Sequence, residues 1–417
     1  MSSHRESSYS LPYYFAPLEF PFAASVGYLQ ICTPYFLSQK GFSLAQIGAI
    51  SATGFLPHAW KLLWVPLLDI GHYRRYWLIL SALLAMVLLY LVGTIAHPEQ
   101  SIGLYTLLIT LCQAAAATSG AAVNGLMATT VKHEQQGLAG GFQMAGNVGG
   151  TAILGVLPIW LSDFWSQQQI MWCLIVLMGL GASVALLIHE TPKKDDHKNA
   201  AAWSWSLWRP IKNLLIDIWA TVKTRSGFLG LLVCAVPVGC GALTNLFSGM
   251  TSAFHVDKHT VEMVNGLWGG VVSALGSLMG GYIVSRINRP LAYCLSGALS
   301  AMVALLMGLL PLGPTNYIVG CLSYMFFNGM AFACFAGIVL QLVSNKKAAT
   351  TQYALFVVAS NQAISYTTYL DGRASVWFSS LGDRAPLLAD ACLTFLGITT
   401  VALVVFLQKP KPSYNAA

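Results

Sequence analysis

Apolar runs of about 20 residues follow one another along nearly the whole chain, and this pattern constrains the fold more than any other feature. A helix needs about 20 mostly apolar residues to cross the hydrocarbon core of a bilayer. Charged residues make up only 9% of the 417 residues, whereas an average soluble domain is about one-quarter charged. The sequence therefore excludes a cytosolic enzyme, a nucleic-acid-binding protein and a disordered scaffold. It predicts an all-α polytopic membrane protein embedded in a lipid bilayer.

Polar residues, glycines and prolines separate twelve such runs. The runs lie near residues 13–38, 44–68, 77–95, 101–129, 137–162, 169–189, 226–253, 261–285, 290–311, 315–343, 349–370 and 386–407. The first run has full spanning length and no small-residue cleavage site follows it, so we expect it to remain as a membrane anchor.

Lysine and arginine residues are distributed unequally between the two sides of the membrane that twelve crossings define. The side with both termini carries 17 of these residues and the other side carries four, while Lys61 lies inside a run. Basic residues are enriched in the cytoplasmic loops of membrane proteins. We therefore expect both termini to be cytoplasmic, and this topology by itself accounts for the formal net charge of +7.

The longest polar stretch, residues 190–225, divides the runs into two sets of six. We predict an N-terminal six-helix bundle over 1–190, a cytoplasmic linker over 191–225 and a C-terminal six-helix bundle over 226–417. Between Ile211 and Val222 the linker carries apolar residues at helical spacing, preceded by tryptophans and basic residues, which is typical of a helix lying in the membrane interface. A simple linker is the alternative.

Two short basic loops occupy the same place in the two sets of runs. One reads Pro66-Leu-Leu-Asp69-Ile-Gly-His-Tyr-Arg74-Arg75, and the other reads Gly281-Tyr-Ile-Val-Ser285-Arg286-Ile-Asn-Arg289. The pair resembles the loop signature of the major facilitator superfamily. The resemblance implies the major facilitator fold, with twelve transmembrane helices in two six-helix bundles.

In that family these loops form a conformational latch whose charges pair in one conformation and separate in another. The latch residues that the resemblance implies are Asp69, Arg74, Arg75, Arg286 and Arg289. For Arg286 and Arg289 the retention of positive charge on the cytoplasmic side is an equal alternative, because Ser285 stands where the second acid is expected.

The second run is similar to a signature of the AmpG-type permeases, which belong to the peptide, acetyl-coenzyme A and drug transporter branch of the superfamily. It reads Leu56-Pro57-His-Ala-Trp-Lys61-Leu-Leu-Trp64-Val-Pro66-Leu-Leu-Asp69. Weaker agreement comes from Glu134-Gln-Gln-Gly137-Leu-Ala-Gly140, from Ala349-Thr-Thr-Gln352-Tyr-Ala354-Leu, and from Pro21 with Gln30 nine residues later. The resemblance implies a secondary active transporter of the inner membrane that imports a polar organic solute, such as a muropeptide, with protons by alternating access. Siderophores and acetyl-coenzyme A are the alternative solutes of the same branch.

The chain departs from the AmpG pattern where those permeases carry charged groups. Asn124 stands where an acid is expected in the fourth run, and Asn147 stands where an arginine is expected in the fifth. Phe327-Asn328 replaces an acid early in the tenth run, and Gly239-Cys240 replaces charges in the seventh. The scaffold thus resembles the permeases, while several charged groups of the cavity are neutral.

Ionisable residues inside the runs are functional candidates, because a charge at the membrane centre costs at least about 2.5–3.5 kcal/mol. Glu19, with Gln30 three helical turns along the same face, is our candidate for a proton-coupling carboxylate. A structural ion pair with Lys61 and exposure of Glu19 at the interface are the alternatives. Lys61, one turn after His58, is our candidate for binding a carboxylate or phosphate of the solute.

Other polar residues recur across the runs of both sets. Asp371 and Asp390 lie near the periplasmic ends of the eleventh and twelfth runs. Amide side chains can join helices to one another, but their recurrence also suggests a shared polar cavity. The amides that we assign to a solute or coupling site are Asn124, Asn147, Asn328 and Asn361.

Signatures of other chemistry are missing from the sequence. There is no P-loop, so ATP is not expected to drive the protein directly. His259 and Met263 lack further metal-ligating neighbours, and no Ser/His/acid set is supported, so we expect no metal, no cofactor and no enzyme activity. A membrane-embedded enzyme acting on a lipid-linked substrate and a non-transporting scaffold remain as alternatives. We expect a monomer whose partners are a small-molecule substrate, protons and the lipid bilayer, with no nucleic acid.

Overall fold

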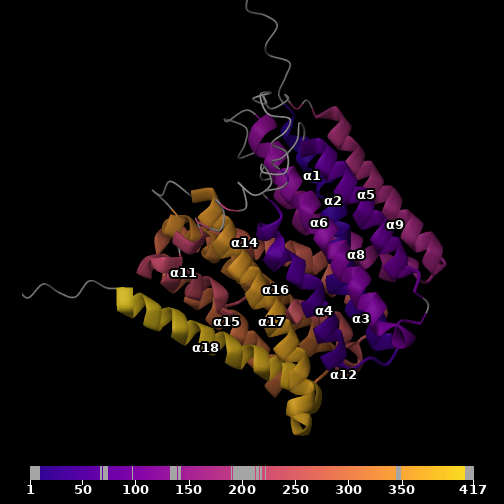
Figure 1. The fold of residues 1–417 in the computed structure, drawn as a ribbon. Helices are drawn as coiled ribbons and strands as arrows, with labels where there is room; N and C mark the ends of the chain where they lie inside the picture. Colours follow the sequence, from indigo (N-terminus) through magenta and orange to yellow (C-terminus); the bar gives the residue numbers. More distant parts are fainter. Residues whose placement is uncertain are drawn as a thin grey trace, which may run out of the picture.

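The computed structural model describes residues 10–408 apart from 66–67, 69–73, 96, 132–138, 140–141, 189, 191–211, 213–215, 217, 221 and 344–348. The regular elements among these residues are all helical. Helices suit a bilayer because each segment satisfies its own backbone N–H and C=O groups without water. The described helices form twelve successive segments, at the positions of the twelve apolar runs, and Figure 1 shows how they pack beside one another.

Each crossing consists of one helix or of a few helices in succession. The first six crossings are α1 (Phe15–Leu18) with α2 (Phe20–Gly27) and α3 (Thr33–Gln39), then α4 (Leu44–Trp60), α5 (Arg74–Gly93), α6 (Ile102–Thr130), α8 (Gly150–Leu161) and α9 (Gln167–Ser183). The last six are α11 (Arg225–Ala235) with α12 (Thr251–Phe254), then α13 (Lys258–Val261) with α14 (Gly269–Arg286), α15 (Arg289–Leu309), α16 (Pro314–Val343), α17 (Ala349–Trp377) and α18 (Ala385–Gln408). We call the side on which the described residues begin and end, at Ser10 and Gln408, the terminal side, and the other side the opposite side.

Four crossings lack the simple form of a long apolar helix. Within the described residues, eight helices are long and apolar enough, by length and composition, to cross a membrane. The first and seventh crossings are interrupted, α4 has only 17 residues, and α17 carries several polar residues, among them Asn361 and Asp371. Apolar length in the sequence therefore located the crossings without indicating where their backbones break.

Two prolines and two glycines account for these interruptions. In the first crossing the helix breaks at Glu19, where Pro17 and Pro21 flank the break and Pro21 has no N–H to continue the hydrogen-bond ladder. In the seventh crossing α11 ends at Ala235, and Gly239 and Gly241 follow with φ angles of 57° and 76°. Only glycine adopts such angles readily, so the chain turns within the membrane before it resumes as short helical turns.

The predicted division of the chain lies in a region of which little is described. Of residues 191–225, those at 212, 216, 218–220 and 222–223 are helical, in the part predicted to lie along the membrane interface. The remainder of the linker up to residue 211 lies outside the described residues. The two six-helix units and the linker between them stay a prediction.

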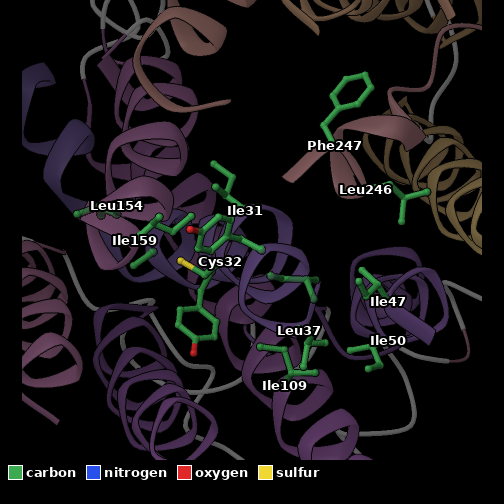
Figure 2. Close-up of a cluster of buried hydrophobic side chains, with 14 of the residues drawn as sticks. Ile31, Cys32, Leu37, Ile47, Ile50, Ile109, Leu154, Ile159, Leu246 and Phe247 are labelled. Carbon is green, nitrogen blue, oxygen red and sulfur yellow. The ribbon is translucent and has the colours of Figure 1, made fainter. Parts of the chain in front are cut away.

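Contacts between the first six and the last six crossings lie toward the opposite side. There α3 packs against a turn at Phe247–Gly249, α8 packs against a π-helical segment at Glu262–Trp268, and α4 packs along α17. A single buried apolar cluster includes Ile31 and Ile47 from the first set together with Phe247 from the second (Figure 2). In Figure 1 the short helices α3 and α12 both lie in the lower part of the molecule.

Polar contacts also join the two sets of helices at the opposite side. Lys258 Nζ lies 2.6 Å from Asp163 Oδ1, which joins the start of α13 to the loop after α8. The Ser248 hydroxyl donates a hydrogen bond of 2.9 Å to the carbonyl of Ile31. The two sets of helices are therefore held together at the opposite side in this conformation.

Two glycines allow α4 and α17 to approach backbone to backbone near the opposite side. A Cβ at Gly48 would lie 3.0 Å from the Cα of Gly372, and a Cβ at Gly372 would lie 2.7 Å from the carbonyl oxygen of Leu44. Such distances leave no room for a side chain at either position. The seam therefore requires glycine on both helices.

Gly372→Leu should separate α4 from α17 and favour a conformation that is open at the opposite side. Spin labels at positions 164 and 381, in opposite-side loops of the two sets, should show a longer mean distance in this variant than in the parent protein. Gly179→Leu is the matched control, because a Cβ at Gly179 meets no atom within 4 Å. An unchanged distance distribution in folded Gly372→Leu protein would contradict the proposed seam.

Candidate transport site

Glu19 is fully buried at the break between α1 and α2. Gln143 Nε2 donates a hydrogen bond of 2.7 Å to one carboxylate oxygen, and Asn147 Nδ2 donates one of 3.1 Å to the other. Burial removes the alternative in which Glu19 is exposed at the interface. The carboxylate instead has two amide donors from a neighbouring crossing.

The close approach of the fifth crossing brings these two amides to Glu19. Gly146 lies between them in sequence and packs directly against the backbone of Ala16, where a Cβ would overlap the carbonyl group. Asn147 also lies in a π-helical segment, Ala145–Gly149, a local widening that often occurs at functional sites. The spacing of Gln143 and Asn147 by four residues then directs both side chains to the same carboxylate.

Lys61 lies near Glu19 at the end of the second crossing. It follows α4 as the first residue of a 3₁₀ turn, Lys61–Leu63, and its side chain is half-buried. Lys61 interacts electrostatically with Glu19 and with His58, yet no direct ion pair joins it to Glu19 among the described residues. The ammonium group of Lys61 is therefore not held in a direct ion pair with Glu19 in this conformation.

His58 is buried one turn before Lys61 and belongs to a hydrogen-bonded chain. Gln113 of α6 donates through Nε2 to the carbonyl of Ser25 at 2.6 Å, so its Oε1 faces His58 Nε2 at 3.0 Å. Because that oxygen can only accept, His58 must donate from Nε2. The imidazole also packs edge-on against Phe22, with ring centroids 5.6 Å apart.

Asn361 connects this region to the second set of helices. Its Nδ2 donates a hydrogen bond of 3.0 Å to the carbonyl of His58. One turn further along α17, the Ser365 hydroxyl donates to the carbonyl of Ala52 at 2.7 Å. A series of contacts thus links Glu19 and Asn147, through Lys61 and His58, to Asn361 of the second set of helices.

Three other predicted site residues have different surroundings. Gln30 is half-buried in the π-helical segment Tyr28–Cys32, and Asn124 is exposed on α6. Asn328 is buried and donates a hydrogen bond of 2.8 Å to the carbonyl of Gly239, so it supports the broken backbone of the seventh crossing. Gln113 and Gln143, in contrast, contact the predicted residues, although the sequence marked them only as two amides among many.

The predicted latch is described in part, because Asp69 lies outside the described residues. The backbone N–H groups of Arg74 and Arg75 donate to the two carboxylate oxygens of Glu190, at 2.9 and 3.1 Å. Glu190 thereby caps the start of α5, where an acid also complements the helix dipole. Arg289 donates to the carbonyl of Gly337 at 3.0 Å, and Arg286 lies over the ring of Tyr282. The role of this group as a latch stays a prediction.

A groove of about 410 Å³ between α4 and α6 contains none of the candidate residues. It is lined by Thr53, Ile102, Gly103, Thr106, Leu107 and Thr110. Each of its three threonines donates its hydroxyl hydrogen to a carbonyl of its own helix, at 2.7 Å in each case. The groove therefore offers few groups that could select a polar solute.

Comparison with known proteins identifies the family of this chain. A model described as Major Facilitator Superfamily matches residues 16–366. The anhydromuropeptide permease of Escherichia coli (strain K12) is 23% identical over 372 residues, which cover 86% of this chain and 71% of that protein. An uncharacterized protein of Haemophilus influenzae is 24% identical over 269 residues, and the matched region spans only 61% of its length.

Solved structures of transporters share the fold. The nucleoside transporter NupG superposes with a TM-score of 0.69 at 14% identity, covering 96% of this chain and 99% of that chain. The D-xylose-proton symporter also superposes with a TM-score of 0.69, at 11% identity and with 97% of each chain covered. The predicted twelve-helix fold is thereby confirmed, while identities this low carry no information on the solute.

A double-mutant cycle should measure the interaction between Glu19 and Gln143. Gln143→Leu should lower the free energy of unfolding by about 1.5 kcal/mol. This value lies at the lower end of the range for hydrogen bonds to charged groups. It lies near the upper end of the range for hydrogen bonds between membrane helices. The same substitution in a Glu19→Gln background should cost much less, because the charged acceptor is gone. Chemical unfolding in mixed micelles supplies the measurement.

Gln167→Leu, at an exposed position at the start of α9, is the control for the change of residue type. Equal losses of stability in the two backgrounds would mean that Gln143 stabilises the protein independently of the carboxylate.

Proposed function

This chain belongs to the major facilitator superfamily and is a membrane transporter rather than an enzyme, and on that premise we propose that it imports a polar organic solute together with protons. The observation that supports this proposal is the buried carboxylate of Glu19, which is held by two amides and lies near Lys61. Glu19 carries the coupling proton, and Lys61 binds an anionic group of the solute.

Electrostatics couples the two roles. A positive Lys61 stabilises the ionised form of Glu19, because opposite charges attract strongly in surroundings of low dielectric constant. A carboxylate or phosphate bound at Lys61 offsets that positive charge, so proton binding at Glu19 becomes more favourable. Solute and proton then bind together, as symport requires, and the amides of Gln143 and Asn147 hold the carboxyl in place throughout.

Asn361 and Ser365 connect the site to alternating access. Both residues lie on α17 and hydrogen-bond to carbonyl groups of α4, so a change at the end of α4 acts directly on the contact between the sets. The contacts near Ile31, Asp163 and Gly48 close the opposite side in this conformation. We assign the conformation to the state that exchanges solute with the terminal side.

A muropeptide is the first candidate for the solute. The Escherichia coli relative, which is named as an anhydromuropeptide permease, aligns over most of this chain. The carboxylates of such a molecule suit Lys61, and its sugar hydroxyl groups suit the neutral amides of the site. A siderophore and an acyl-coenzyme A are the alternatives, and both carry anionic groups that Lys61 could bind. We place the protein in the inner membrane as a monomer with both termini cytoplasmic.

Uptake of labelled anhydromuropeptide by cells lacking their own permease tests the proposal. Expression of this protein should restore uptake, and a protonophore should abolish accumulation against the gradient. Absence of uptake, with the protein detected in the membrane, would contradict a muropeptide as solute and favour the siderophore or the acyl-coenzyme A.

Two variants separate the proposed roles. Lys61→Gln should lower uptake roughly tenfold or more, equivalent to about 1.4 kcal/mol of lost solute binding. Glu19→Gln should keep solute exchange between equal concentrations but lose accumulation driven by the proton gradient. Lys223→Gln, at an exposed position beside Trp219, is the control and should transport normally. Normal accumulation by both site variants would refute the site.

A further inference from the structure

A second pair of ionisable groups lies far from Glu19, among the last six crossings. Asp371 of α17 and Asp390 of α18 have exposed fractions of 0% and 1%, and their carboxyl groups lie within hydrogen-bonding reach of each other. In the sequence the two aspartates are separate acids near helix ends, but in the fold they form one buried pair.

The two carboxyl groups have unequal partners. The hydroxyl of Tyr324 on α16 lies 3.2 and 3.1 Å from the two oxygens of Asp390 and can donate to either. Both oxygens of Asp371 are buried, and no donor reaches them in the part of the chain that the structure describes. Since two adjacent buried carboxylates would repel each other without compensation, a single proton on Asp371, donated to Asp390, removes this repulsion and gives one oxygen of Asp371 a partner.

The charged groups around the two carboxylates do not neutralise them in place of this proton. The titratable groups that face the pair are Tyr324 from α16 and Cys240 from the broken seventh crossing. Arg373 lies over the ring of Trp377, and Arg384 donates to the carbonyls of Gly308 and Leu309. From α4, His58 and Lys61 lie at the level of Asn361, about 15 Å from Asp371 along α17 at 1.5 Å per residue. No ion pair to either aspartate is found among the described residues.

The pair adjoins the break in the seventh crossing. Helix α17 bonds to both sides of that break, because Tyr366 donates to the carbonyl of Ala235 at 2.8 Å and Asn245 donates to Thr368 at 3.0 Å. Irregular backbone at membrane depth occurs where it is buried in protein or lines a polar site, and broken helices carry ion sites in many transporters. The break is the element whose movement would bring water to the pair.

We propose that Asp371 and Asp390 form a proton-binding site at the break of the seventh crossing, distinct from Glu19, which holds one proton between the two carboxyl groups and exchanges it with water. On release, the O–H bond of Asp371 breaks and the proton passes to water, which leaves two carboxylates that repel each other. Because α17 also carries Asn361 and Ser365, that repulsion acts on the contact with α4. This second site extends the proposed proton coupling, and its role in transport rests on that proposed function.

Infrared spectroscopy of the purified full-length protein tests the site without any solute. The measurement is made in a Glu19→Gln background, which removes the fully buried carboxyl group of the first crossing. This parent protein at neutral pH should show a carbonyl band of a protonated carboxylic acid that shifts in D₂O. Asp371→Asn should lose this band, and Asp383→Asn, an exposed aspartate in the loop before α18, should retain it. Tyr324→Phe removes the donor to Asp390 and should shift the band while keeping it, which provides a second variant if Asp371→Asn fails to fold.

Absence of a protonated-carboxyl band in the parent protein would overturn the proposal, as would an identical band in Asp371→Asn. A thermal unfolding temperature that rises with sodium chloride but not with potassium chloride, and only when both aspartates are present, would overturn it in favour of bound sodium. The infrared result is independent of muropeptide uptake, so each proposal can fail while the other stands.

Discussion

A charge or an unpaired backbone group inside the hydrocarbon has no water to bind, so the protein itself must supply each partner. Glu19 receives two amide donors, and His58 is held through Gln113 to the backbone of Ser25. The broken backbone of the seventh crossing is supported in the same way, by Asn328. Each of these contacts joins two different crossings, and the buried polar groups therefore help to determine how the helices are arranged.

Interrupted helices place these groups where regular helices could not. The first crossing breaks at Glu19 because Pro21 cannot continue the hydrogen-bond ladder, and the seventh breaks at Gly239 and Gly241, whose φ angles are positive. Both candidate proton sites lie beside one of these breaks. Helix α17 connects them, since it bonds to α4 through Asn361 and to the seventh crossing through Tyr366. A change at either site can therefore act on the same contact between the two sets of helices.

The residues at the candidate site differ in how far the sequence predicted them. Glu19 and Lys61 are visible because a charge inside an apolar run is costly wherever it lies. Asn124 and Asn328 were selected from the family pattern, yet one is exposed and the other supports a backbone break. Gln143 could have been preferred over the other amides, because its spacing of four residues from Asn147 places both on one helix face.

The sequence by itself determined the twelve crossings and the scarcity of intramembrane charge, because apolar length and charge are properties of a segment alone, and the resemblance of its two basic loops to the family signature implied the major facilitator fold. Only the tertiary structure decided that Gln143 reaches Glu19, that Asn361 reaches the carbonyl of His58, and that Asp371 meets Asp390. These partners lie on different crossings, and which helices approach closely depends on glycines such as Gly48, which packs against Gly372, and Gly146, which packs against Ala16. Such pairing has no period in the sequence, so it became visible only in the packed helices.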